Sequence, residues 1–353
     1  MSLYVDIEKD LGSFKLKVKF EQEDGIVGLL GQSGCGKSMT LKCIAGIERP
    51  DEGRIVLNDR VLFDSKKKIN LPPQKRKVGY MFQDYALFPN MNVVQNIQAG
   101  MGRKPDQKKV QEYITGFHLT GLETHMPDQL SGGQKQRVAM ARMLAAEPEL
   151  LLLDEPFAAL DSYLKWKMEQ QMMDLLKDIQ KPALFVSHSR DEVYRLCDTV
   201  SCINQGKMEV IEPVKEFFKN PKTKTAALLS GCKNICSVEL VKDLEPDKSF
   251  GKLWAAEWGV AFNVSKEAFT ARTVGIRAHY MMQKKPKAGH ITELTVGEYR
   301  ILEDPFEWNI SFRKDENCEW LQWKISKSDW NPSVGVPKVL YVREEDLLLL
   351  DKE

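Results

Sequence analysis

The sequence has no apolar run that approaches the roughly 20 residues a helix needs to cross a bilayer. Its first residues, MSLYVDIEKDLG, contain neither a basic leader nor the apolar centre of a signal peptide. These absences argue against a membrane-spanning or secreted chain. We therefore expect any role at a membrane to be peripheral and on the cytoplasmic face.

The chain also has no large excess of either charge, because 51 Lys and Arg residues balance 50 Asp and Glu residues. A chain without a global positive field is not expected to bind nucleic acid. The seven cysteines lack the paired Cys-x-x-Cys spacing of a metal site, and only Cys232 and Cys236 form a spaced pair. We expect all seven to be reduced thiols.

Apolar residues make up 42% of the 353 positions, which is enough to bury a substantial core in two or three domains. Strand-like apolar runs alternate with helical patterns over about the first 220 residues, as in GIVGLLG, VGYMF, LLLLDE and ALFVSH. This alternation predicts an α/β domain over residues 1–230. Residues 86–145 hold no buried-strand run, which predicts a helical subdomain inserted in it.

Short alternating strands follow, such as WNISF, WLQWKI and VLYV, and they predict a mostly β second domain over residues 231–353. Six of the seven tryptophans lie in this domain. Tryptophans of this kind either form the core and the sheet faces or line a ligand site. The sequence leaves both interpretations open.

The segment GQSGCGKS, residues 31–38, follows a strand-like run, opens a helical pattern and fits the phosphate-loop motif G-x-x-x-x-G-K-[ST]. Its three glycines allow backbone conformations in which consecutive amides point at phosphate oxygens. The helix N-terminus adds partial positive charge. Lys37 is predicted to reach the β- and γ-phosphates, and the Ser38 hydroxyl is predicted to bind Mg²⁺.

Polar residues follow three further buried runs. Asp154 ends LLLLD, at the edge where open α/β sheets bind ligands, and suits Mg²⁺ as a hard oxygen ligand through water. Glu155 comes next and is predicted to orient and deprotonate the water that attacks the γ-phosphorus. Gln83 and His188 follow VGYMF and ALFVS. An amide beside the ion and an imidazole near the γ-phosphate would distinguish bound ATP from ADP.

The segment LSGGQ, residues 130–134, opens another helical pattern. Ser131 can cap this helix, and the bare glycine backbone can approach an anion closely. LSGGQ is therefore a second phosphate-binding helix N-terminus, although it has no lysine.

In this order, GQSGCGKS, Gln83, LSGGQ, LLLLDE, AALD and His188 resemble the motifs of the ATP-binding cassette (ABC) ATPases over about the first 230 residues. The resemblance implies a P-loop NTPase domain with a helical subdomain, and ATP and Mg²⁺ as cofactors. It also implies a head-to-tail homodimer, in which LSGGQ completes the ATP site of the opposing subunit.

The predicted site has residues from both chains of such a dimer. Catalysis is assigned to Lys37, Glu155 and His188, and Mg²⁺ binding to Ser38, Gln83 and Asp154. Nucleotide binding within one chain is assigned to Gly31, Gln32, Ser33, Gly34, Cys35, Gly36, Lys37, Ser38, Met39 and Gln83. From the partner chain, the resemblance assigns γ-phosphate contacts to Ser131, Gly133 and Gln134 and an interface role to Asp161.

Two positions depart from the family's pattern. Ala158 stands where the family usually has a serine, so one interfacial hydroxyl is missing. Many relatives stack adenine on an aromatic residue near the N-terminus, whereas this chain has Leu11 at the corresponding position and Phe14 as the nearest ring. This departure predicts loose base selectivity.

ABC importers often carry a C-terminal β domain, whereas exporters commonly fuse membrane helices to the cassette. The resemblance therefore favours an importer ATPase with an oligomer-binding-like C-terminal domain of the TOBE/MOP type, to which TVGIRAH, residues 273–279, is similar. FVSHSRDEVYRLCD and the run from VLNDR to NMNV resemble molybdate and tungstate importer ATPases. The alternatives are importers of sulfate, iron, sugar or polyamine, and a soluble ABC regulator without a permease.

Partners follow from the same resemblance. In the family, the region of DYALFPNMNVVQNI forms the groove that receives a helix of the membrane permease, although its apolar residues also suit the core of the helical subdomain. A substrate-binding protein would be an indirect partner. The C-terminal domain would stabilise the dimer, bind a regulatory protein or bind the oxyanion. The lysine-rich runs SKKKIN and PPQKRKV are predicted to be solvated hairpin charge, with contact to anionic lipid as the alternative.

Overall fold

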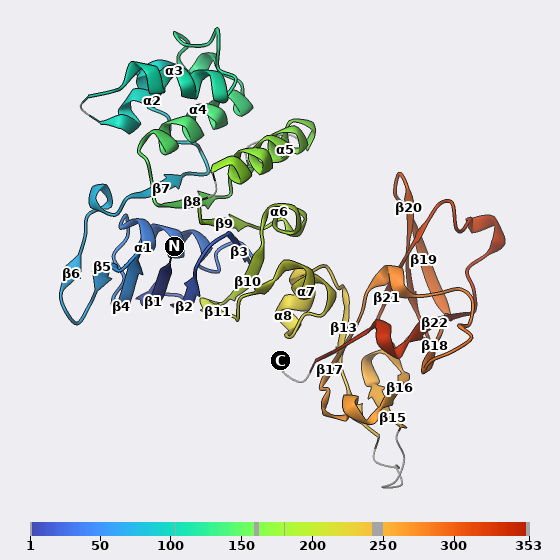
Figure 1. Cartoon of the computed structure of the whole chain (residues 1–353). Helices are drawn as coiled ribbons and strands as arrows, with labels where there is room; N and C mark the ends of the chain where they lie inside the picture. Colours follow the sequence, from blue (N-terminus) through green and yellow to red (C-terminus); the bar gives the residue numbers. More distant parts are fainter. Residues whose placement is uncertain (1, 103, 159–161, 180, 242–249, 351–353) are drawn as a thin grey trace. The chain divides into compact units, whose positions relative to one another are not determined.

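A computed structural model of the chain describes residues 2–102, 104–158, 162–179, 181–241 and 250–350. The chain forms two compact units, Met1–Lys215 and Glu216–Glu353 (Figure 1). The domain boundary expected near residue 230 stays a prediction. Asp161, which the sequence assigns to a dimer interface, lies outside the described residues.

The first unit is built on a twelve-stranded sheet with a parallel part and an antiparallel part. The parallel strands are buried on both faces, which explains why Leu150–Leu153 of the strand LLLLD are all fully buried. In spatial order the parallel strands are β10 (Thr199–Asn204), β3 (Ile26–Leu30), β9 (Ala183–Ser187), β8 (Leu150–Asp154) and β7 (Val78–Met81). The antiparallel part has β6 (Ile69–Asn70), β5 (Arg60–Asp64), β4 (Glu52–Leu57), β1 (Leu3–Asp10) and β2 (Lys15–Gln22), while β11 (Lys207–Met208) joins the two parts and β12 (Glu212–Pro213) pairs with β10.

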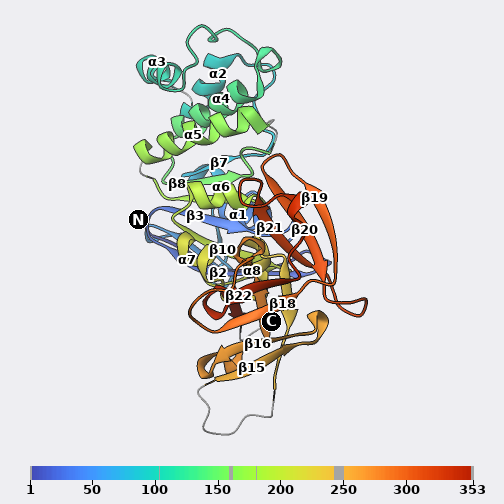
Figure 2. The same ribbon diagram turned by 90° about the vertical axis from the view of Figure 1, so that its right-hand side faces the viewer.

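Some of the helices of this unit form a group of their own. Helices α2, α3 and α4 gather beyond β7 and β8, as Figures 1 and 2 both show. They arise from the segment that the sequence predicted to be a helical subdomain. The helices are α1 (Lys37–Ala45), α2 (Val93–Met101), α3 (Gln107–Gly116), α4 (Gly132–Ala145), α5 (Ser162–Ile179) and α6 (Arg190–Leu196), with the 3-10 turns η1 (Pro73–Lys75) and η2 (Pro127–Gln129).

The second unit is mostly antiparallel β structure and contains helix α8 (Lys224–Leu229), whereas α7 (Val214–Lys219) begins before it. Its sheets are β13 (Asn234–Ser237), β17 (Thr273–Ile276) and β23 (Leu347–Leu350); β14 (Glu239–Leu240), β15 (Phe250–Ala255) and β16 (Val260–Ser265); β18 (Ile291–Thr295) and β22 (Val339–Arg343); and β19 (Glu298–Glu303), β20 (Glu307–Arg313) and β21 (Leu321–Ser326). The 3-10 turns are η3 (Ala256–Trp258), η4 (Lys266–Thr270), η5 (Ala278–Tyr280), η6 (Pro332–Val334) and η7 (Glu344–Asp346).

Three tryptophans, Trp258, Trp323 and Trp330, lie in the buried core of the second unit. Trp320 instead makes cation–π contacts. The guanidinium carbons of Arg300 and Arg313 lie 4.4 and 4.8 Å, respectively, from the centroid of its ring. These tryptophans therefore serve packing and cation–π contacts within the unit.

All seven cysteines belong to the described part of the chain, and each is a free thiol. Burial raises the pKa of Cys43 to about 12 and that of Cys232 to about 11, which keeps both protonated at neutral pH. The prediction of reduced thiols agrees with this state. Across the described ranges, every helix is too short or too polar to span a bilayer.

Arg76 lies within the lysine-rich run PPQKRKV, and its exposure differs from the one that the sequence predicts. It is fully buried rather than solvated. Its guanidinium donates to the carbonyls of Cys43 and Ile44 at the end of α1, to the Leu71 carbonyl and to the Asn70 side chain. Burial lowers the pKa of Arg76 to about 10. The prediction of solvated charge is therefore wrong at this position, because the last carbonyls of α1 need donors.

Candidate functional site

Four segments of the predicted site follow four neighbouring parallel strands. The phosphate loop follows β3, Gln83 follows β7, Glu155 follows β8 and His188 follows β9. Because the carboxyl ends of parallel strands meet at one edge of a sheet, these segments lie together. An open cleft of about 520 Å³ at this edge is lined by Ser38, Lys42, Phe82, Gln83, Asp84, Asp154 and Ala158.

The phosphate loop is closed around its own lysine. Gly36, with φ of 111°, is the N-cap of α1, a conformation that favours glycine. A Cβ at Gly31 would lie 2.6 Å from the Ile203 carbonyl oxygen, so no larger residue fits there. The Lys37 ammonium donates to the carbonyls of Gly31 and Gln32, at 2.8 Å each. A phosphate would give this ammonium a charged acceptor, which is a stronger hydrogen-bond partner than either carbonyl.

Ser38 and Asp154 bring two oxygen donors together next to the loop. The Ser38 hydroxyl donates to Asp154 Oδ1 at 2.7 Å, and Asp154 is 6% exposed. No group of three His, Cys, Asp or Glu residues within the described ranges could hold a metal by protein ligands alone. Mg²⁺ commonly binds through one or two carboxylates together with substrate phosphates. The donor set therefore fits Mg²⁺ bound together with a nucleotide.

Tyr80 on β7 is a member of this site that the sequence reasoning missed. Its hydroxyl donates to Asp154 Oδ2 at 2.7 Å. Burial raises the pKa of Tyr80, and the charge of Asp154 raises it further. The only signal in the sequence is a hydroxyl within the apolar run VGYMF, where a tyrosine is usually a core residue.

Glu155 and His188 are neighbours, as their strand ends predict. Glu155 Oε2 lies 3.3 Å from His188 Nδ1. Glu155 has a φ of 45°, in the left-handed region that non-glycine residues rarely adopt, and its N–H donates to the Val186 carbonyl at 3.1 Å. Backbone strain of this kind collects at functional sites and persists only where surrounding contacts hold it.

LSGGQ caps a helix, as predicted. Ser131 Oγ accepts from the Gln134 N–H at 3.3 Å, and Gln134 Oε1 accepts from the Ser131 N–H at 2.8 Å, which forms a capping box on α4. Ser131, Gly133 and Gln134 are described residues, and the cleft of Ser38 and Asp154 includes none of them in its lining. Their contacts in trans remain a prediction.

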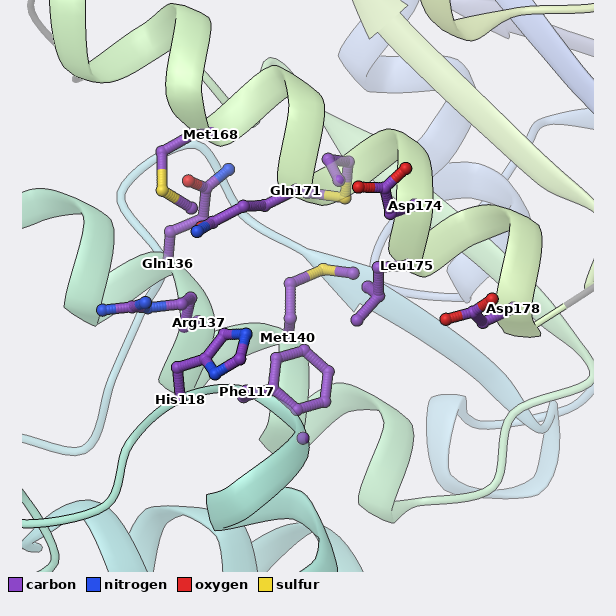
Figure 3. Close-up of a pocket in the computed structure, with 12 residues that line it drawn as sticks. Phe117, His118, Gln136, Arg137, Met140, Met168, Gln171, Asp174, Leu175 and Asp178 are labelled. Atoms are coloured by element: carbon purple, nitrogen blue, oxygen red, sulfur yellow. The ribbon is translucent and has the colours of Figure 1, made fainter.

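Helix α4 and the loop after Gln83 are hydrogen-bonded to Pro156, the residue after Glu155. The carbonyl of Pro156 accepts from the Gln136 amide at 3.2 Å and from the Tyr85 hydroxyl at 3.3 Å. Gln136 is fully buried on α4 and faces a hollow of about 200 Å³ between α4 and α5 (Figure 3). This hollow is separate from the cleft of Ser38 and Asp154, since the two have no lining residue in common.

The loop after Gln83 is held by Arg142 of α4. The Arg142 guanidinium donates to the carbonyls of Tyr85 and Ala86, at 2.9 and 2.8 Å, and both residues have positive φ. Its carbon also lies 5.0 Å from the centroid of the Phe88 ring, which is 46% exposed. Tyr85 is buried, so the predicted groove residues divide between core and surface.

Phe14 lies beside the phosphate loop. Its ring is half-buried against the core, and a Cβ at Gly36 would lie 3.7 Å from it. Leu11, which the family's pattern would make aromatic, packs against the same core. Phe14 is therefore an aromatic ring in contact range of the phosphate loop.

We expect Phe14→Ala to weaken ATP binding about 10-fold, because base stacking on an aromatic ring contributes about 1–3 kcal/mol. Titration calorimetry with ATP and with inorganic tripolyphosphate measures this effect, since tripolyphosphate has no base. Leu11→Ala is the control and should leave both affinities unchanged. Equal losses for ATP and tripolyphosphate would show that Phe14 supports the loop and does not stack adenine.

The phosphate loop, the Ser38–Asp154 oxygen pair and the Glu155 carboxylate, all on one edge of a parallel sheet, define a nucleotide-binding protein of the P-loop NTPase class. Comparison with known proteins supports this class. Residues 15–158 match the family model described as ABC transporter. A solved structure of the ATP-binding cassette MJ0796, in a dimeric post-hydrolysis state bound to ADP and Pi, matches with a TM-score of 0.50 and 25% identity, over 61% of this chain and 99% of that chain.

Curated relatives agree. A molybdenum import ATP-binding protein, ModC, of Pectobacterium atrosepticum is 39% identical over 239 residues, which are 65% of this chain and 67% of that protein. The iron(III) import ATP-binding protein FbpC 2 of Haemophilus influenzae is 43% identical over 217 residues, 60% of each chain. The chain therefore belongs to the ABC transporter family, among its ATP-binding proteins. The predicted fold class, with an α/β domain and a further β domain, is confirmed.

The match is partial in length. The chain spans 60% or 61% of the length of three further ModC proteins, which are 40–42% identical to it. Family membership therefore fixes the class of the nucleotide-binding domain, and the activity and cargo of the whole chain follow as proposals.

Proposed function

We propose that this chain is the ATP-hydrolysing subunit of an ABC importer. The observation that carries the proposal is the hydrogen bond between Ser38 and Asp154, together with the contact between Glu155 and His188. Lys37 would bind the β- and γ-phosphates, and Glu155 would take a proton from the attacking water. Mg²⁺, held by Ser38, Asp154 and Gln83, would neutralise charge on the phosphates. His188 would hold Glu155 in place and contact the γ-phosphate.

We further propose that two chains bind two ATP molecules between them. Ser131, Gly133 and Gln134 belong to a capped helix N-terminus, an end that suits an anion, and none of them lines the cleft of Ser38 and Asp154. A second copy would bring this end to the γ-phosphate. The exposed ring of Phe88 would offer an apolar contact to a multi-span permease, and a chain bound in this way would act at the cytoplasmic face of a membrane.

Molybdate or tungstate is the cargo we propose. The support is the set of ModC relatives at 39–42% identity. Import of iron(III) is the second candidate, because FbpC relatives are 43% identical. The cargo would be selected by the binding protein and permease.

Transport by a reconstituted complex tests this proposal. The full-length chain, co-expressed with its permease, should co-purify with it and drive Mg²⁺- and ATP-dependent molybdate uptake into vesicles. The same complex with Lys37→Ala should assemble and transport nothing. Uptake of iron(III) in place of molybdate would favour the second candidate. ATP hydrolysis without any retained permease would favour a soluble regulator.

A further inference from the structure

Each oxygen of the Asp154 carboxylate has its own hydroxyl donor. Ser38 donates to Oδ1 and Tyr80 donates to Oδ2, and both distances are 2.7 Å. Because Asp154 is only 6% exposed, its carboxylate depends on these donors more than a solvated one would. The two bonds together fix the rotation of the carboxylate about its last side-chain bond.

The strands determine where the Tyr80 hydroxyl lies. β7 and β8 are parallel neighbours in which Tyr80 is opposite Leu152, two residues before Asp154. Alternate residues of a strand share a face, so Tyr80 and Asp154 lie on the same face of the sheet. Val78, Leu150 and Leu152 share this face and pack in the cluster that includes Leu41 and Ile44 of α1. Ser38, in the first turn of α1, therefore meets Asp154 from this side.

The ring of Tyr80 is held independently of its hydroxyl. It packs against the same core cluster, and its centroid lies 4.4 Å from that of Phe82. A phenylalanine at position 80 would keep these contacts and lose only the bond to Asp154. The hydroxyl is therefore separable from the packing role of the side chain.

We propose that Tyr80 is a positioning residue for the magnesium site, acting through Asp154. The inference rests on the proposed function, because it takes Asp154 as the carboxylate that serves Mg²⁺. The Tyr80 hydroxyl holds Oδ2 and thereby fixes the direction in which the Asp154 carboxylate faces Ser38. Groups that orient a metal ligand through a hydrogen bond typically change metal affinity about 10-fold to 100-fold when they are removed.

Two effects of losing the hydroxyl oppose each other. A carboxylate without this donor keeps more of its negative charge, which by itself would tighten binding of the ion. However, Oδ2 would then lie buried without a partner, and both oxygens would compete for the single hydroxyl of Ser38. A hydrogen bond to a buried charge contributes more than one between neutral groups, so the loss of orientation outweighs the gain in charge.

Nucleotide binding across a magnesium titration tests the proposal. The full-length chain, as wild type and as Tyr80→Phe, is titrated with a non-hydrolysable ATP analogue at increasing MgCl₂ and separately in EDTA. We expect Tyr80→Phe to raise the Mg²⁺ concentration for half-maximal binding about 10-fold. Affinity in EDTA should be unchanged, which also shows that the variant is folded. Mg²⁺-dependent ATP hydrolysis should recover at high MgCl₂.

Tyr113→Phe is the matched control. Tyr113 is also half-buried, and its hydroxyl donates to the Leu144 carbonyl at 3.1 Å, away from the cleft. This variant should match wild type in both titrations. An unchanged or lower Mg²⁺ midpoint for Tyr80→Phe would overturn the role of Tyr80. If wild type itself binds the analogue no better with Mg²⁺ than in EDTA, the proposed nucleotide chemistry fails as well.

Discussion

Glu155→Gln should lower the rate of ATP hydrolysis roughly 1000-fold, because a positioned general base contributes about 10²–10⁴-fold. The amide keeps the shape of the side chain and can still accept a hydrogen bond, so ATP binding should persist. ATP that is bound between two chains and not hydrolysed should keep them together, since a ligand that binds only the dimer favours the dimer. The variant should therefore accumulate as an ATP-bound dimer, measured by size-exclusion chromatography with light scattering at saturating MgATP.

Glu112→Gln provides the control for this change. Glu112 is an exposed residue of α3, and its substitution should leave both hydrolysis and oligomeric state as in wild type. A Glu155→Gln chain that stays monomeric at saturating MgATP would contradict the placement of LSGGQ in the partner's site. A chain that dimerises and still hydrolyses ATP would contradict the role of Glu155 as base. The two parts of the proposal can thus fail separately.

The location of these groups was predictable from the sequence because it depends on short-range order. A buried run of apolar residues fixes where a strand ends, and parallel strands end at one edge. Asp154, Glu155 and His188 could therefore be placed together before any contact was known. The glycines and the helix start likewise determine the shape of the phosphate loop locally.

Two residues could not be predicted, since their roles depend on neighbours distant in the sequence. Tyr80 meets Asp154 only because β7 and β8 are adjacent, 74 residues apart along the chain. Arg76 stands among lysines that are exposed, and the carbonyls it serves on α1 are more than 30 residues away. Neither composition nor periodicity predicts such contacts.

Arg76→Met should lower the free energy of unfolding by about 3 kcal/mol, measured by urea denaturation at pH 7. Methionine fills most of the same volume without any donor. The carbonyls of Ile44 and Leu71 would then lose the donor they have now, whereas that of Cys43 keeps the Gly46 N–H at 3.3 Å. Each buried acceptor left unpaired costs about 1–3 kcal/mol.

Removing Arg76 also removes a buried charge, which by itself would favour the folded state. Replacing a buried ion pair with apolar residues is often neutral for this reason. The partners of Arg76 are backbone carbonyls and one amide, however, and the substitution cannot remove the carbonyls. The loss of their donor should therefore dominate. Lys75→Met, at the exposed neighbouring position, should change stability by less than about 0.5 kcal/mol. Equal stability of the two variants would mean that water replaces the guanidinium at the end of α1.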